Sequence, residues 1–143
     1  MKIGASTACF YPLETEKALK KVCELGYKYA EVFMNAPSEL EEPFLKQLNT
    51  IAKDGGTDIV SVHPFSSFME SSCIFTDYQR RFDDFISIYD KTCHAAAVLG
   101  AEYVVIHGAV AHPKIPIPDE RYFDRFNTVS YTHLRAHETR SNL

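Results

Sequence analysis

Two histidines occupy the same place in two copies of one sequence pattern. In each copy a glycine is followed, seven residues later, by the last residue of an apolar run: Gly56 leads to His63, and Gly100 leads to His107. Imidazole nitrogens bind divalent metals and exchange protons near neutral pH. We therefore take His63 and His107 as candidate metal ligands or substrate-contacting groups. The alternative for each is a histidine that only holds the structure together through hydrogen bonds.

The pattern that carries these histidines predicts the fold. A third copy runs from Gly26 to Phe33, and each apolar run has the length and the β-branched or aromatic composition of a strand. Each run also follows a segment of helical periodicity, which indicates an α/β fold with parallel strands and crossover helices. We expect four parallel strands, adjacent in chain order, at about 2–8, 28–34, 58–63 and 102–107.

Three helices and one long loop are expected between these strands. The first helix spans about 15–25, and the second opens at the capping box Ser38-x-x-Glu41. A long third helix follows Thr76, whereas the Ser- and Phe-rich segment 64–76 is predicted to be a loop.

The two faces of each strand differ, because side chains alternate along a strand with period two. Positions four and six after the glycine are apolar, and positions five and seven include the polar residues. The first set is Ala30, Val32, Val60, Val62, Val104 and Ile106; the second is Glu31, Phe33, Ser61, His63, Val105 and His107. Both histidines thus share the more polar face at the carboxyl ends of their strands, where parallel α/β folds bind ligands.

Five further residues near these strand ends are candidates for the site. Glu31 and Ser61 could orient the histidines, or Glu31 could pair only with a polar group on a neighbouring strand. Asn35 could hydrogen-bond a hydroxyl of a bound substrate or serve as a turn residue. Phe10 and Phe65 could form apolar pocket walls or pack within their loops.

Composition narrows the class of protein. The 143 residues fit one domain with 45% hydrophobic and 24% charged residues, which is typical of a globular protein. The net charge of −4 gives no basic footprint for a nucleic acid. The sequence has no signal peptide and no long apolar span, so we expect a cytoplasmic protein with no membrane partner.

Residues 1–128 resemble the amino-terminal half of the xylose isomerase-like barrels, which include sugar phosphate isomerases and epimerases and zinc-dependent apurinic endonucleases. Four segments in order carry the resemblance: Lys-Ile-Gly, Leu-Gly-Tyr-Lys-Tyr-Ala-Glu-Val-Phe, Ser-Val-His-Pro-Phe and Leu-Gly-Ala-Glu-Tyr-Val-Val-Ile-His-Gly. The resemblance implies a TIM (β/α)8 barrel. Only its first four βα units are present, as an open half-barrel.

The same resemblance implies a function for the full-length parent. It suggests a metal-dependent isomerase or epimerase that acts on a small carbohydrate, a sugar or sugar phosphate, by proton abstraction next to a carbonyl. The divalent metal would be Mn, Mg, Zn or Co, with most of its ligands and the base in the later strands, and the protein could be a homo-oligomer. In the endonuclease members, histidines at the positions of His63 and His107 are zinc ligands.

Two alternatives stay open. The first is an apurinic endonuclease-like DNA repair hydrolase, which the acidic net charge disfavours. The second is that the chain as given is an inactive fragment that holds no metal tightly, because two histidines fall short of the three protein ligands usual at a catalytic zinc site.

Residues 129–143 depart from the repeated pattern. They contain no glycine and no strand-like apolar run, and the phrase Ser-Tyr-Thr-His-Leu-Arg-Ala-His-Glu-Thr resembles translated adapter or vector sequence. We expect a non-native or disordered tail after residue 128.

Overall fold

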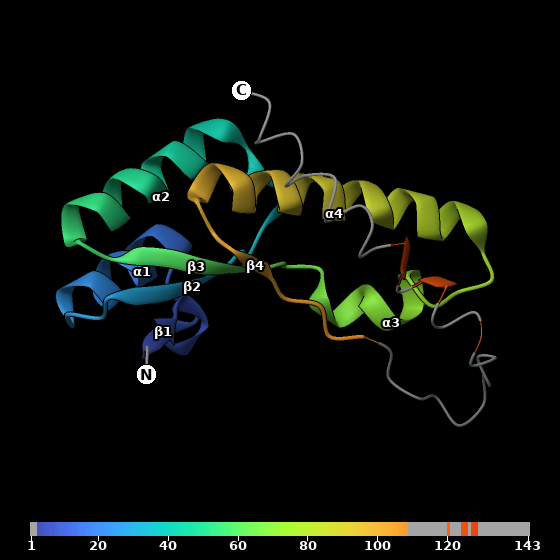
Figure 1. The fold of residues 1–143 in the computed structure, drawn as a ribbon, viewed down its shortest axis with the longest axis horizontal. Coiled ribbons are helices and arrows are strands. Elements are labelled where there is room, and N and C mark those ends of the chain that lie inside the picture. Colours follow the sequence, from blue (N-terminus) through green and yellow to red (C-terminus); the bar gives the residue numbers. More distant parts are fainter. Residues whose placement is uncertain (1–2, 109–119, 121–123, 126, 129–143) are drawn as a thin grey trace. The chain divides into compact units, whose positions relative to one another are not determined.

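The structure is a computed structural model that describes residues 3–108, 120, 124–125 and 127–128. The described residues form two compact units, one of residues 3–65 and 94–105 and the other of residues 66–93 and 106 onward. Figure 1 shows the elements in chain order. The tail predicted at 129–143 lies outside the described residues.

The first unit contains a four-stranded parallel sheet. Its strands are β1 (Gly4–Ser6), β2 (Tyr29–Phe33), β3 (Asp58–His63) and β4 (Tyr103–Val104), in the order β1-β2-β3-β4. Every neighbouring pair is parallel, which confirms the predicted fold class and strand order. The ladder of β4 is shorter than the predicted 102–107, although Val105 still donates its backbone N–H to the carbonyl of Val62 at 3.0 Å.

The predicted helices connect these strands. They are α1 (Thr15–Glu24), α2 (Glu42–Gly55) and α4 (Gln79–Leu99), and α4 contributes residues 79–93 to the second unit and 94–99 to the first. Gly26, Gly56 and Gly100 follow the three helix ends with φ of 78°, 61° and 76°. In this left-handed region glycine avoids the steric penalty of a Cβ, so the repeated glycine ends each helix and turns the chain toward the next strand.

The core of the first unit lies between the sheet and the helices. Its fully buried members come from α1, α2, β2, β3, the end of α4 and the residue after β2: Leu19, Val22, Ala30, Val32, Met34, Leu45, Leu48, Val62 and Ala95. In β2 this leaves Tyr29, Glu31 and Phe33 half-buried on the opposite face, as the period-two pattern predicts.

An irregularity in β3 changes the predicted faces. Ala30 pairs with Ile59 and Glu31 with Ser61, so Val60 has no counterpart on β2. The extra residue puts Ile59 into the core, while Val60 is only half-buried. The prediction that Val60 shares the buried face of Val62 was therefore wrong.

Two local predictions also failed. Ser38 does not open α2 but lies in the 3-10 helix η2 (Pro37–Leu40), and α2 begins at Glu42 with Pro43 in its first turn, where proline fits best. The predicted loop 64–76 contains two short helices, η3 (Ser67–Met69) and α3 (Glu70–Cys73). None of the helices in the described ranges has the length and apolar character that crossing a membrane would require.

Candidate functional site

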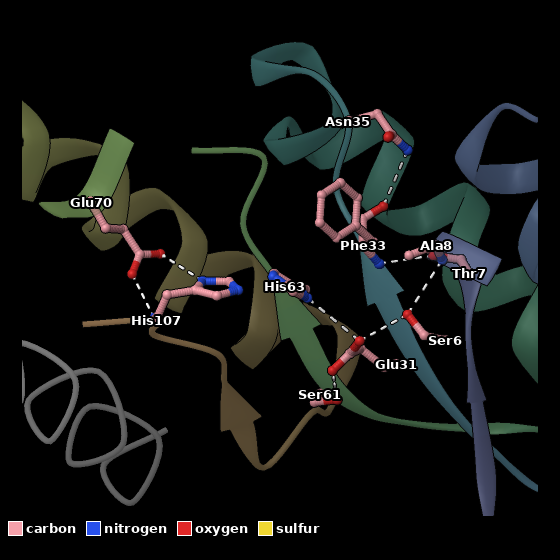
Figure 2. A network of polar contacts seen from close by, with 10 residues as sticks. All are labelled: Ser6, Thr7, Ala8, Glu31, Phe33, Asn35, Ser61, His63, Glu70 and His107. Carbon is pink, nitrogen blue, oxygen red and sulfur yellow. Dashed lines mark hydrogen bonds and ion pairs between the residues drawn. The ribbon is translucent and has the colours of Figure 1, made fainter. Parts of the chain in front are cut away.

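Glu31 is the centre of a polar cluster in the first unit (Figure 2). The parallel register places Ser6 of β1 and Ser61 of β3 on either side of it. Ser6 donates its hydroxyl to Oε1 at 2.8 Å, and Ser61 donates to Oε2 at 3.3 Å. The Nδ1 atom of His63 lies 3.5 Å from the same Oε1. Glu31 therefore contacts polar groups of both neighbouring strands as well as the histidine, and its role in orienting that histidine stays a prediction.

The ring of His63 is held from two sides. Its Nδ1 faces the Glu31 carboxylate, and the ring of Phe33 packs against it edge-on, with centroids 4.6 Å apart and planes at 65°. His63 ends β3 and pairs in register with Phe33 of β2. Both residues that contact the ring, Glu31 and Phe33, therefore come from the adjacent strand β2. With side-chain exposures of 17% for His63 and 29% for Glu31, the pair is only partly shielded from water.

Asn35 lies in a turn network just after β2. Its side-chain amide donates to the Thr15 hydroxyl at 2.7 Å and to the Phe33 carbonyl at 3.4 Å. Its backbone N–H donates to the Glu39 carboxylate at 2.6 Å, and Glu39 also accepts from Thr15. These bonds are those of a structural turn, and contact with a sugar hydroxyl stays a prediction.

Phe10 and Phe65 are half-buried and pack against the core of the first unit. Phe10 ends the 3-10 helix η1 (Thr7–Phe10), and Phe65 follows β3 by two residues. Their role as pocket walls stays a prediction. A cavity of about 360 Å³ in the second unit is lined by residues from η3, α3, the amino-terminal half of α4 and the preceding Tyr78, and by none of the predicted site residues.

His107 belongs to the second unit, where it meets a buried glutamate (Figure 2). Its backbone N–H donates to Oε2 of Glu70 at 2.6 Å, and its Nδ1 lies 3.5 Å from Oε1. Tyr89 of α4 donates its hydroxyl to Oε1 at 2.6 Å. The side chain of Glu70 is fully buried, whereas that of His107 is 45% exposed. His63 is in the other unit, and a ligand shared by the two histidines stays a prediction.

The sequence analysis missed Glu70 and Tyr89. Glu70 was missed because segment 64–76 has no helical periodicity, and Tyr89 fitted the apolar stripe of α4 as an ordinary core residue. The one available signal was a charged residue within a segment rich in serine and phenylalanine. Only the long-range contacts reveal that this charge is buried.

The described residues do not form a complete metal site. Within them, no three His, Cys, Asp or Glu side chains are grouped so that they could hold a metal ion. A catalytic zinc usually has three protein ligands. Each histidine faces one carboxylate, and the Glu31 carboxylate already accepts from two serines. Each histidine could thus supply one ligand to a metal ion, and further ligands would be needed to complete a site.

Solved structures share this fold. The chain is similar to a D-tagatose 3-epimerase-like protein, with a TM-score of 0.75 and 18% identity over 97% of this chain and 49% of that one. It is similar to a D-psicose 3-epimerase crystallised in the presence of D-fructose, with a TM-score of 0.70 and 13% identity over 94% and 50%. It is also similar to a xylose isomerase-like TIM barrel protein from Mycobacterium smegmatis in complex with magnesium, with a TM-score of 0.62 and 15% identity over 94% of this chain and 52% of that one.

The chain spans about half the length of these solved structures. No protein-family model matches its sequence, and the search of curated proteins gave no match. At these identities the likeness establishes the fold. The four parallel strands and their helices form an α/β arrangement that matches the amino-terminal half of the TIM-barrel epimerases.

Proposed function

We propose that this chain forms the first four βα units of a (β/α)8-barrel sugar isomerase or epimerase, which moves a proton at the carbon next to a carbonyl. The observation that carries the proposal is the Glu31–His63 pair at the carboxyl end of β3. In this class of fold, catalytic side chains are gathered at that end of the strands. The names of two structural neighbours, both 3-epimerases or like one, support a ketose or related polyol as the substrate.

His63 is suited to contact a sugar. A neutral imidazole whose Nδ1–H points at a carboxylate carries its lone pair on Nε2, so Nε2 can accept a proton or a hydrogen bond. Glu31 holds the ring by its carboxylate and Phe33 by its edge-on contact. In this proposal Phe10 and Phe65 offer apolar surface to the C–H faces of the sugar, and Asn35 lies at the hydroxyl-binding side.

A divalent metal belongs to the complete barrel in this proposal. Such an ion, when bound, polarises the oxygens of a carbonyl substrate. His63 and His107 would each supply at most one ligand, and the remaining ligands and the principal base would come from strands five to eight. The residues of this chain orient the substrate and the imidazoles.

The proposal is tested on the protein encoded by the continuous reading frame beyond residue 128. The purified protein is incubated with ketoses in D₂O with Mg²⁺ or Mn²⁺, and the exchange of the proton next to the carbonyl is followed by NMR. We expect exchange and a new stereoisomer or aldose. The variant His63→Asn should lower the exchange rate about 10- to 100-fold, which is typical of losing a positioned acid–base or ligand-orienting group.

A matched control is available on the surface. His94 of α4 is 60% exposed and pairs only weakly with Glu42, so His94→Asn should leave the exchange rate unchanged. Equal loss in the two variants would contradict a role for His63 at the site. Cleavage of DNA at abasic sites, without proton exchange on any ketose, would replace this proposal by the endonuclease alternative.

A further inference from the structure

The buried carboxylate of Glu70 contacts the Tyr89 hydroxyl, the backbone N–H of His107 and the His107 ring. Tyr89 donates its hydroxyl to Oε1 at 2.6 Å, and the backbone N–H of His107 donates to Oε2 at 2.6 Å (Figure 2). Both oxygens therefore accept a short hydrogen bond. The backbone N–H at Oε2 can only donate, and a protonated Oε1 would have to reverse its bond with Tyr89, so the hydrogen bonds as they stand suit the ionised form.

Tyr89 reinforces this assignment. It is 1% exposed, and burial followed by the hydrogen bond to Glu70 raises the pKa of its phenol well above the ordinary value. The phenol therefore keeps its proton throughout the pH range in which proteins are folded. Its hydroxyl remains a fixed donor to the carboxylate.

The third group at Glu70 is the imidazole of His107. Its Nδ1 lies 3.5 Å from Oε1, the oxygen that also accepts from Tyr89. A lone pair on Nδ1 would face a negatively charged oxygen and repel it, whereas an N–H would be attracted. The proton of a neutral imidazole is thus favoured on Nδ1, and the lone pair on Nε2.

We propose that Glu70, supported by Tyr89, is a positioning residue that fixes His107 in the Nδ1–H tautomer and makes Nε2 its basic atom. The assignment of the tautomer is independent of the proposed function. Its use, to contact a substrate oxygen or a metal through Nε2, rests on that function. A carboxylate that receives the second ring N–H of a histidine typically sets the orientation and raises the basicity of that histidine.

The tautomer can be measured directly on the 143-residue chain. In ¹⁵N-labelled protein, two-bond ¹⁵N–¹H correlations of each imidazole distinguish Nδ1–H from Nε2–H, and the variant His107→Gln assigns the signals by their loss. The spectrum is recorded at alkaline pH, where the imidazole signals no longer change with pH, so that the neutral ring is observed. We expect the Nδ1–H pattern for His107 and a low-field backbone amide proton, because that amide bonds a carboxylate at 2.6 Å.

Two variants separate positioning from folding. Glu70→Gln should abolish the Nδ1–H preference and move the His107 amide proton upfield, whereas Tyr89→Phe should preserve the preference because the carboxylate remains. A predominant Nε2–H tautomer in the wild-type chain would overturn the proposal, whether or not the variants fold. So would an unchanged Nδ1–H pattern in a folded Glu70→Gln chain.

The link to function is read separately in the complete enzyme. There, Glu70→Gln should lower kcat or metal affinity about 10- to 100-fold, the usual effect of removing a group that orients a ligand or base. If the tautomer is as expected but no ketose is turned over by the wild-type enzyme, the proposed function fails and the positioning role of Glu70 stands. If turnover occurs and Glu70→Gln leaves both constants unchanged, the positioning of His107 by Glu70 has no role in the reaction.

Discussion

Replacing Glu31 by glutamine keeps the shape of the side chain but removes its charge and one acceptor oxygen. Three groups then compete for the remaining oxygen: the Ser6 hydroxyl at 2.8 Å, the Ser61 hydroxyl at 3.3 Å and Nδ1 of His63 at 3.5 Å. A hydrogen bond to a charged group contributes roughly 1.5–3 kcal/mol where water is excluded. Because Glu31 is 29% exposed, we expect Glu31→Gln to lower the free energy of unfolding by about 1–2 kcal/mol.

The distances also predict which partner matters most. A double-mutant cycle between Glu31→Gln and Ser6→Ala should give a coupling energy of about 1 kcal/mol, and the cycle with Ser61→Ala less than about 0.5 kcal/mol. Ser6→Ala also removes the bond from the Ala8 N–H at 3.3 Å, which caps η1. That loss is common to both arms of the cycle and cancels.

The assay is urea unfolding followed by circular dichroism, at one fixed chain concentration so that any self-association affects all variants alike. The slope of the unfolding free energy with urea should stay constant, so that shifts of the midpoint report stability alone. Two results would refute the reasoning: a Glu31→Gln chain as stable as the wild type, or a Ser61 coupling that exceeds the Ser6 coupling.

Four further outcomes concern Gly55, Cys93 and Tyr103. A Cβ on Gly55 would lie 2.4 Å from the Cβ of Cys23, so Gly55→Ala should destabilise the chain by about 1–3 kcal/mol in the same urea assay. Burial raises the pKa of the Cys93 thiol to about 11, so in the native chain it should resist thiol reagents at pH 8 that modify the exposed Cys9. The folded state binds this proton more tightly than the unfolded one, so stability should fall between about pH 9 and 11, and less so in a Cys93→Ala chain, measured by urea titration. Tyr103 is 62% exposed on β4, an edge of the described sheet, so Tyr103→Lys should lower self-association in sedimentation velocity; an unchanged distribution would exclude this edge.

The order and the parallel arrangement of the strands could be predicted from the sequence because the helix–glycine–strand pattern occurs three times. Each glycine ends a helix in the left-handed region and introduces a strand, and the three copies agree with one another. The contact between Glu31 and His63 was also within reach, because strand alternation puts both on one face and the register pairs their strands. The register shift at Val60 could not be predicted, because an apolar residue does not reveal whether it pairs with a residue of the neighbouring strand.

The second histidine shows where such reasoning ends. Four residues of helix, Glu70–Cys73, are too few to produce a periodic pattern. The partners of Glu70 lie 19 and 37 residues further along the chain, and no local rule connects them. The burial of a charge depends on donors that tertiary structure brings together, so the sequence contained the imidazole of His107 but not the group that orients it.

The two glutamates differ in burial, and this difference separates their effects on stability from their effects on the histidines. Each presents one carboxylate oxygen at 3.5 Å from the Nδ1 of its histidine. Water reaches Glu31, so a lost hydrogen bond there is partly replaced. Glu70 is fully buried, and Glu70→Gln leaves one acceptor oxygen for two short hydrogen bonds and turns the amide group toward a donor, a loss of about 3 kcal/mol. We therefore expect Glu70→Gln to unfold at clearly lower urea than Glu31→Gln, while both variants change the tautomer of their own histidine alone. Equal destabilisation by the two would mean that water reaches Glu70 as well.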